Sequence, residues 1–242
     1  MDLRLTQLTL SALPGALADL LMPRECAVCG RQLLPRERHL CLECEADIPF
    51  THFATLAHNP MADAFNAQVE APHYVRAAAL FYYTGDYQNI TRALKYHRNF
   101  ALGRCFAGRL GDELAAVPFW ADVDAVCPVP LHWTRRFSRG YNQADVIGRE
   151  LAGKLGAAFR PSLLRRVRRT RSQTRLGSEG RAQNVSGAFR AMAPQDPPAH
   201  ILLVDDVFTT GATLAACYAA LRSALGATVR ISIATLAFVD NG

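Results

Sequence analysis

The sequence predicts an α/β domain with a mostly parallel sheet flanked by helices, preceded by a small cysteine-rich module. Short apolar runs alternate with helix-like segments from residue 75 onward, a pattern typical of β-α-β units. Four cysteines form two closely spaced pairs between residues 24 and 50. That stretch has too little apolar content for a hydrophobic core of its own, so we expect its fold to depend on the cysteines.

The chain divides into four parts on these grounds. We expect an N-terminal amphipathic helix over 1–23, the cysteine module over 24–50, an irregular connection over 51–74 and the α/β domain over 75–242. Within that domain the expected strands span residues 77–83, 124–129, 163–167, 201–204 and 229–238. The expected helices span residues 87–95, 101–116, 144–155 and 214–225.

Composition narrows the class of protein and its partners. Half of the 242 residues are apolar and 20% are charged, which is ordinary for a globular chain in water. The formal net charge of +6 favours an anionic partner, whether nucleic acid, phosphosugar or membrane surface. Residues 3–22 have apolar positions at helical spacing, but polar residues and Pro14 interrupt them. We therefore expect no membrane span, keep a signal peptide as the alternative, and expect the protein in the cytoplasm.

The four cysteines have the spacing of a metal-binding knuckle. Cys26, Cys29, Cys41 and Cys44 form the pattern C-x2-C-x11-C-x2-C, and Gly30 follows the first pair. Two such pairs can present four thiolates to one tetrahedral Zn²⁺ ion, which then supplies folding free energy. Disulfides or an iron–sulfur cluster are the alternatives, and a cytoplasmic setting disfavours the disulfides.

The segment ILLVDDVFTTGAT, at 201–213, carries the strongest functional signal. Its apolar run predicts a buried parallel strand, with Asp205 and Asp206 at the carboxyl end. A small hydroxyl-rich turn then opens a helix, and its residues are Thr209, Thr210, Gly211, Ala212 and Thr213. Such a turn can hold a dianionic phosphate, and carboxylates can accept hydrogen bonds from vicinal ribose hydroxyls. The alternative is an ordinary strand–turn–helix junction with a threonine N-cap.

Two arginine-rich segments also suit a charged ligand. In PVPLHWTRRFSRGYNQ, at 128–143, the turn residues Val129, Pro130 and Leu131 precede Arg136 and two further arginines. Arginine makes bidentate phosphate contacts, so this segment can clamp a diphosphate, and a solvated basic loop is the alternative. The segment 165–189 holds seven arginines and has no clear period. A basic flap that closes over a charged substrate fits this pattern, and so does a nucleic-acid contact surface.

Together these segments resemble one protein family. VDDVFTTGAT is similar to the phosphoribosyl pyrophosphate signature of type I phosphoribosyltransferases. With the four-cysteine array, LKYH at 94–97, RGYNQ at 139–143 and R-x-x-N-V-S-G-A-F at 181–189, the chain resembles the ComF/GntX family. That family pairs a cysteine knuckle with a type I phosphoribosyltransferase-like domain, so the resemblance implies this fold.

The resemblance also implies a function. It implies Mg²⁺-dependent transfer of a phosphoribosyl group to an unidentified acceptor, with Asp205 and Asp206 orienting the ribose. Residues 209–213 would hold the 5′-phosphate, while 129–131 and Arg136 approach the pyrophosphate. Relatives are linked to natural competence and DNA utilisation, which implies an alternative. In that alternative the protein is a non-catalytic uptake factor whose zinc module and basic flap bind single-stranded DNA or a protein of the uptake machinery.

Overall fold

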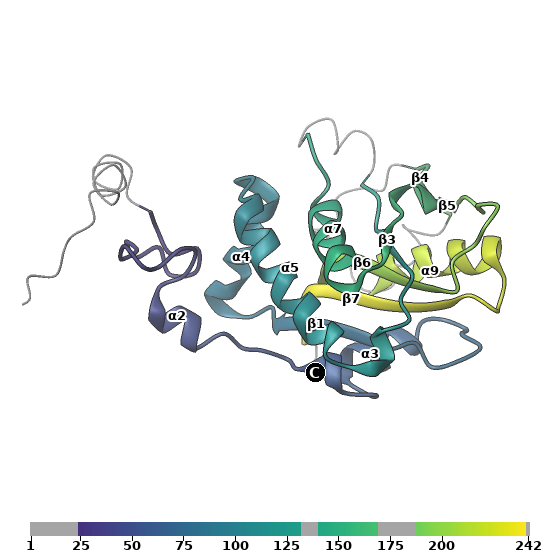
Figure 1. The fold of residues 1–242 in the computed structure, drawn as a ribbon, viewed down its shortest axis with the longest axis horizontal. Helices are drawn as coiled ribbons and strands as arrows, with labels where there is room; N and C mark the ends of the chain where they lie inside the picture. Colours follow the sequence, from purple (N-terminus) through teal and green to yellow (C-terminus); the bar gives the residue numbers. More distant parts are fainter. Residues whose placement is uncertain (1–23, 132–139, 169–186, 241–242) are drawn as a thin grey trace, which may run out of the picture. The chain divides into compact units, whose positions relative to one another are not determined.

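The computed structural model describes residues 24–131, 140–168 and 187–240. It divides into two units, Met1–Ile48 and Pro49–Gly242, and each is considered by itself (Figure 1). The expected N-terminal helix over 1–23 lies outside the described residues. Within the described ranges, no helix has both the length and the apolar character needed to cross a membrane.

The smaller unit is built around the first cysteine pair. Its chain reverses at Gly30, which has a φ of 74°, and the Gly30 N–H donates to the carbonyl of Cys26 at 2.9 Å. Helix α2 (Leu42–Ala46) begins directly after Cys41. Among the described residues of this unit, the buried apolar side chains other than cysteine are Val28, Leu33, Leu40 and Ile48. Such a core is small for an independent fold.

The larger unit contains a five-stranded sheet in the order β1-β7-β6-β2-β3, and every neighbouring pair is parallel. Its strands are β1 (Ala77–Tyr82), β2 (Ala125–Pro128), β3 (Ala158–Phe159), β6 (His200–Phe208) and β7 (Arg230–Phe238). The long strands β6 and β7 lie side by side in the sheet (Figure 1). The predicted α/β class with a mostly parallel sheet is therefore confirmed, and all carboxyl ends lie at one edge.

Helices cover both faces of this sheet. The main helices are α3 (Pro60–Asn66), α4 (Gln88–Tyr96), α5 (Phe100–Ala115), α7 (Gln143–Leu155) and α9 (Ala212–Leu225). Short 3-10 turns span Phe53–Thr55, Gly85–Tyr87, Pro118–Trp120 and Pro161–Leu163. Ile201 and Leu203 of β6 share one core with α3 and α9. Leu202 and Val204 are equally buried but point to the opposite face, since side chains alternate along a strand, and α7 packs on β6 there.

Residues 51–74, expected as an irregular connection, contain part of this core. Phe65 of α3 is fully buried in it. Asn59 fixes the start of α3, because its Oδ1 accepts from the Ala62 N–H at 2.9 Å. The same side chain donates through Nδ2 to the carbonyl of Ala77 in β1, also at 2.9 Å. A seven-residue helix is too short to give a clear periodic signal, which explains why the sequence pattern did not predict it.

The strand expected at 163–167 lies outside the main sheet. It is β4 (Leu164–Arg166), which pairs antiparallel with β5 (Phe189–Ala191) as a separate two-stranded ribbon. This ribbon packs on α9. Between β4 and β5 runs most of the arginine-rich segment expected as a flap, of which 169–186 lie outside the described residues. The described ends of the segment are thus held next to each other.

The other expected helices and strands begin and end within two residues of the elements in the structure, except for β6. The apolar run predicted a strand that ends at Val204, but β6 continues to Phe208. Val207 and Phe208 pair with Ala237 and Phe238 of β7. These residues are apolar or aromatic on both strands, so pairing continues past the acidic pair.

A buried histidine lies at the amino end of β6, opposite to the carboxyl edge. The Nδ1 of His200 is 2.9 Å from Asp122 Oδ1, and its Nε2 is 2.9 Å from Ser232 Oγ. Burial lowers the pKa of His200 to about 4. In a neutral ring, Nδ1–H donates to the carboxylate and Nε2 accepts from the hydroxyl. Both nitrogens are therefore satisfied, as expected for a structural residue.

Candidate functional site

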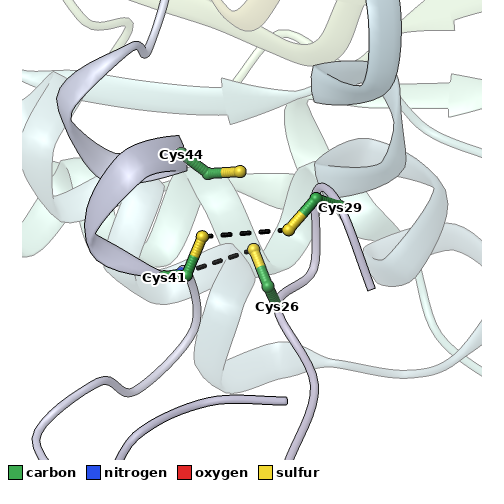
Figure 2. Close-up of side chains that lie close together, drawn as sticks. All are labelled: Cys26, Cys29, Cys41 and Cys44. Atoms are coloured by element: carbon green, nitrogen blue, oxygen red, sulfur yellow. Dashed lines mark hydrogen bonds between the residues drawn. The ribbon is translucent and has the colours of Figure 1, made fainter. Parts of the chain in front are cut away.

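Four thiol groups converge in the smaller unit (Figure 2). The Sγ atoms of Cys26, Cys29, Cys41 and Cys44 all lie within 4.8 Å of one another, and those of Cys29 and Cys41 are 3.8 Å apart. Tetrahedral Zn–S bonds of about 2.3 Å separate sulfurs by roughly 3.8 Å, whereas a disulfide bond is about 2.05 Å long. All four cysteines are free thiols. The cluster can therefore hold a metal ion such as Zn²⁺.

The surroundings of this cluster favour a thiolate at Cys41, whereas burial raises the pKa of the Cys44 thiol. The backbone N–H of Cys41 donates to Cys26 Sγ at 3.4 Å. Hydrogen bonds from the Cys44 backbone and then from the Arg31 side chain lower the pKa of Cys41 to about 6. Arg31 is itself held by a two-point ion pair with Glu43 of α2, at 3.1 and 3.0 Å. A deprotonated cysteine is the form that binds a metal ion.

In the larger unit, the acidic pair lies within β6 rather than after it. Asp205 pairs in register with Thr235 of β7, so the two carboxylates follow the alternation of the strand. Asp205 belongs to the face of α9, where it influences the thiol of Cys217. Asp206 points to the opposite face and is 7% exposed. The two acids therefore have different neighbours.

Asp206 forms an ion pair with a lysine that sequence reasoning did not assign to the site. Lys95 Nζ, at the end of α4, lies 2.8 Å from Asp206 Oδ2, and the side chains are 26% and 10% exposed. Burial alone would lower the pKa of Lys95, but the Asp206 carboxylate, with smaller contributions from Asp205 and Tyr83, outweighs it, so the pKa is raised. Within the described chain, no N–H or O–H group meets Oδ2 with hydrogen-bond geometry. The contact is therefore a close pairing of charges.

Asp205 is the acid that resists ionisation. Burial, followed by the neighbouring charge of Asp206, raises the pKa of Asp205 to about 7. The Asp206 N–H, which donates to Asp205 Oδ1 at 2.9 Å, and the charges of Lys95 and Arg166 limit this rise. Ionisation of Asp205 is therefore disfavoured near neutral pH.

The turn 209–213 joins β6 to α9 and is held by a distant side chain. Gly211 has a φ of 78°, and a Cβ there would lie 2.6 Å from Phe208 Cζ and 2.9 Å from Gln68 Nε2, so glycine is required. Gln68 follows α3 and donates to the carbonyl of Thr210 at 2.7 Å. No side chain caps α9. Its first backbone N–H groups, including those of Ala212 and Thr213, therefore have no intrahelical acceptor.

The end of β2 borders a cavity of about 460 Å³. Pro130 and Leu131 line it, and Val129 joins β6 through its N–H, which donates to the carbonyl of Val204 at 2.8 Å. Asn142, the residue before α7, donates to the carbonyl of Val129 at 3.0 Å and so fixes the turn. Three arginines contribute to the wall: Arg149, Arg165 and Arg166. Asp205, Asp206 and the 209–213 turn are not part of the lining.

Comparisons with known proteins identify the family. No protein-family model matches the chain. DNA utilization protein YhgH of Salmonella typhimurium is 30% identical over 193 residues, which cover 78% of this chain and 80% of that protein. The chain belongs to the ComF family. Competence protein F of Haemophilus influenzae is 27% identical over 198 residues, covering 78% and 86%, and YhgH of Escherichia coli K12 is 28% identical over 193 residues, covering 78% and 80%.

One solved structure is also similar to this ComF-family chain. Adenine phosphoribosyl transferase from Trypanosoma brucei, in complex with AMP, pyrophosphate and ribose-5-phosphate, covers 77% of this chain and 84% of its own. Its sequence identity is 12% and its TM-score 0.33. This TM-score is too low to establish a common fold, so the fold described above rests on the strand order and register of the chain itself.

Two motifs of the ComF resemblance lie against each other in the structure. The hydroxyl of Tyr141, in the RGYNQ segment, donates to the carbonyl of Leu94 in α4. Tyr141 also packs edge-to-face on Phe100, with ring centroids 4.7 Å apart. The guanidinium of Arg98 lies 6.0 Å from the Tyr141 ring centroid. The end of α4, which carries Lys95, is therefore fixed to the segment that leads into α7.

The structure thus distributes the residues expected at the site over three places. The cysteines form one cluster, the acidic pair and the 209–213 turn lie at the end of β6, and 129–131 lie at the neighbouring end of β2. Arg136 lies outside the described residues. Sequence reasoning missed Lys95, Gln68 and Asn142 as contributors. Only the LKYH motif gave a signal for Lys95, because contacts between distant segments leave no local pattern.

Proposed function

We propose that this chain binds phosphoribosyl pyrophosphate with Mg²⁺ and transfers its phosphoribosyl group to an acceptor. The arrangement at the end of β6 carries the proposal, because a carboxylate pair is followed by a turn that leaves the first N–H groups of α9 without an intrahelical acceptor or a side-chain cap. A phosphoribosyl group has the complementary chemistry, with two vicinal hydroxyl donors and a dianionic phosphate. Parallel sheets bind ligands at this edge.

Each expected residue has a role in this proposal. Asp205 and Asp206 start toward opposite faces of β6, and in this proposal both reach over its carboxyl edge to accept hydrogen bonds from the ribose hydroxyls. Residues 209–213 hold the 5′-phosphate. The diphosphate lies toward 129–131 and the arginines of the adjacent cavity. Arg136, in the segment beyond Leu131, contributes a further bidentate phosphate contact. The strands β2 and β6 are neighbours, which supports one ligand reaching both turns.

The chemistry is a substitution at C1 of the ribose. A nucleophilic nitrogen of the acceptor, an amine or a nucleobase, forms a bond to C1. The C1–O bond to the diphosphate breaks, and pyrophosphate leaves with the bonding electrons while the acceptor loses a proton to water. Mg²⁺ neutralises the diphosphate when bound and is held mainly by ligand oxygens and water. The arginines at the cavity stabilise the charge that develops on the leaving group.

The variant Asp205→Asn/Asp206→Asn tests this proposal. Charge-assisted hydrogen bonds contribute about 1.5–3 kcal/mol each, so losing both should weaken binding by roughly 3 kcal/mol, about a hundredfold. Calorimetric titration with Mg²⁺ and phosphoribosyl pyrophosphate measures the effect. Asp112→Asn, which removes an exposed carboxylate of α5, is the matched control and should bind like the wild type. Equal affinity of wild type and double variant would show that the ribose-binding role is wrong.

We further propose that the cysteine cluster holds one structural Zn²⁺ ion. The convergence of four thiols within 4.8 Å, in a unit with few buried apolar side chains, supports this. Zinc bound by four thiolates has no open coordination position, so the ion stabilises the fold and takes no part in the transfer.

The printed names of the relatives favour a second candidate, a factor that handles single-stranded DNA. Those names refer to DNA utilization and to competence, and the net charge of +6 suits a polyanion. In this candidate the cysteine module and the basic segment 165–189 contact the strand or a protein of the uptake machinery. The phosphoribosyl site then senses a ligand without turnover.

Limited proteolysis separates the two candidates at the basic segment. Trypsin cleaves after arginine, so the 165–189 segment offers many sites. If it closes over the diphosphate, Mg²⁺ with phosphoribosyl pyrophosphate should slow cleavage there severalfold. Protection by single-stranded DNA instead supports the DNA contact. Absence of protection by both ligands would contradict both roles of the segment.

A further inference from the structure

The ion pair between α4 and β6 lies at the proposed ribose site and has no role in the function described so far. Lys95 Nζ is 2.8 Å from Asp206 Oδ2, and both side chains are largely buried. The chain contains only two lysines. The other, Lys154, is 38% exposed and pairs with Asp112 at the surface. Removing a lysine ammonium from water costs free energy, even beside one of two adjacent acids. We therefore expect this buried ion pair to serve a function.

The ion pair is suited to the hydrogen bonds that ribose hydroxyls donate to carboxylates. A hydroxyl donates best to an ionised carboxylate, but two adjacent, buried carboxylates resist holding two negative charges. A cation beside one of them removes that obstacle. Among the described residues, the charges of Lys95 of α4 and Arg166 of β4 act on Asp205, while Tyr83 after β1 acts on Lys95 and Asp205 acts on the thiol of Cys217 of α9. Lys95 and Arg166 are the cations of this set.

We infer that Lys95 is a positioning residue of the phosphoribosyl site, whose ammonium holds the Asp206 carboxylate turned so that its second oxygen accepts a ribose hydroxyl. The inference rests on the proposed function. Asp206 Oδ2 faces the ammonium, which leaves Oδ1 for the ligand. The charge of Lys95 also limits the rise in the pKa of Asp205, and does so more than the charge of Arg166, so the one ammonium serves both acids.

Hydrogen bonds on both sides of Lys95 fix the end of α4 that carries it. The carbonyl of Leu94, directly before Lys95, accepts the hydrogen bond of Tyr141. The N–H of Asn99, after the helix, donates to the carbonyl of Ala93 at 3.3 Å. The backbone on both sides of the lysine is therefore fixed, and the ammonium reaches β6 from an anchored helix end. A charge held this way is preorganised for the ligand.

Two substitutions test the inference, with Mg²⁺ and phosphoribosyl pyrophosphate as the probe. Lys95→Met removes the charge and keeps the length, and it should weaken binding at least tenfold at pH 7. The loss of affinity should be larger at pH 6 than at pH 8.5, because removing the cation raises the pKa of Asp205 further and favours its protonated form at low pH. Lys95→Arg should restore most of the affinity. Lys154→Met, the matched control, should bind like the wild type at every pH.

A merely structural role predicts a different result. It gives a loss that does not depend on pH, or equal binding by Lys95→Met and wild type, and either outcome overturns the inference alone. A wild type that shows no binding overturns the proposed function, and the inference with it. Circular dichroism and urea unfolding report whether the larger unit of Lys95→Met is folded. If it is not folded, the affinity of Lys95→Arg still tests the inference.

The pairing itself has a readout that needs no ligand. Reductive methylation with ¹³C-formaldehyde labels the two lysines and the terminal amine, and Lys154→Met assigns the lysine signals. Asp206→Asn should lower the pKa of Lys95 and leave Lys154 unchanged. An unchanged Lys95 titration in Asp206→Asn shows that the ion pair does not form in solution and overturns the inference.

Discussion

The cysteine module and the α/β unit differ in what covers their apolar side chains. Among its described residues, the module buries Val28, Leu33, Leu40 and Ile48 beside its cysteines. The larger unit closes a parallel sheet between helices on both faces, with whole strands such as β7 nearly buried. Burial of about 25 cal/mol per Å² of apolar surface can therefore support the larger unit. The difference teaches that the two units need different supports: if the module binds zinc as proposed, metal binding and apolar packing should each be removable without the other.

Metal removal should have the largest effect and should be confined to the module. Structural zinc contributes about 10–16 kcal/mol in small zinc domains, so Cys41→Ser or a strong chelator should unfold residues 24–48. Amide hydrogen exchange read by mass spectrometry should show lost protection there and unchanged protection in peptides from 49–240. Elemental analysis should find about one zinc per wild-type chain.

Cys105→Ser is the control for that experiment, because Cys105 lies in α5 and outside the cluster. It should keep both the metal and the exchange pattern. A module that stays protected without metal, or an iron–sulfur absorbance band in the purified protein, would contradict the division between the two supports.

Truncation of a core side chain should destabilise the larger unit and leave the cysteine module unchanged. Leu203 of β6 is fully buried beneath α3 and α9. Leu203→Ala should lower the free energy of unfolding of the larger unit by about 2–5 kcal/mol, because it removes apolar contacts and leaves a cavity. Urea unfolding followed by circular dichroism measures the loss. Zinc content should stay at the wild-type value, and a parallel loss of zinc would show that the two supports are coupled.

Acid should weaken the larger unit through His200, with a smaller effect. Its pKa is lowered to about 4 by burial, against about 6.5 in an unfolded chain. Between these values the unfolded state binds more protons, so stability falls as pH drops from about 7 to about 4, by up to roughly 3 kcal/mol. Proton NMR of the imidazole should show His200 neutral at pH 5.

The exposed His73 provides the comparison in the same spectra. His73→Gln should leave the acid dependence of urea unfolding unchanged, whereas His200→Gln should flatten it between pH 7 and 4. If His200 titrates near pH 6.5, its burial is not what makes the larger unit sensitive to acid.

The sequence predicted most elements of the fold because their signals are local. The apolar runs around Leu203 and Ile233 identified the central strands, and the cysteine spacing identified the cluster. The end of β6 was predicted too early, since the acidic pair looked like a terminus although Val207 and Phe208 continue the strand. The ion pair between Lys95 and Asp206 joins segments 111 positions apart. No period or spacing encodes such a contact, so only the folded chain reveals it.

The hydrogen bond from Gln68 to the carbonyl of Thr210 has a practical consequence for shortened versions of the chain. It spans 142 positions and ties the turn before α9 to the segment after α3. A fragment that starts at residue 75, just before β1, would keep the acidic pair and the 209–213 turn yet lose this hydrogen bond together with α3. Functional expression of the larger unit alone should therefore begin at Pro49, the first residue of that unit.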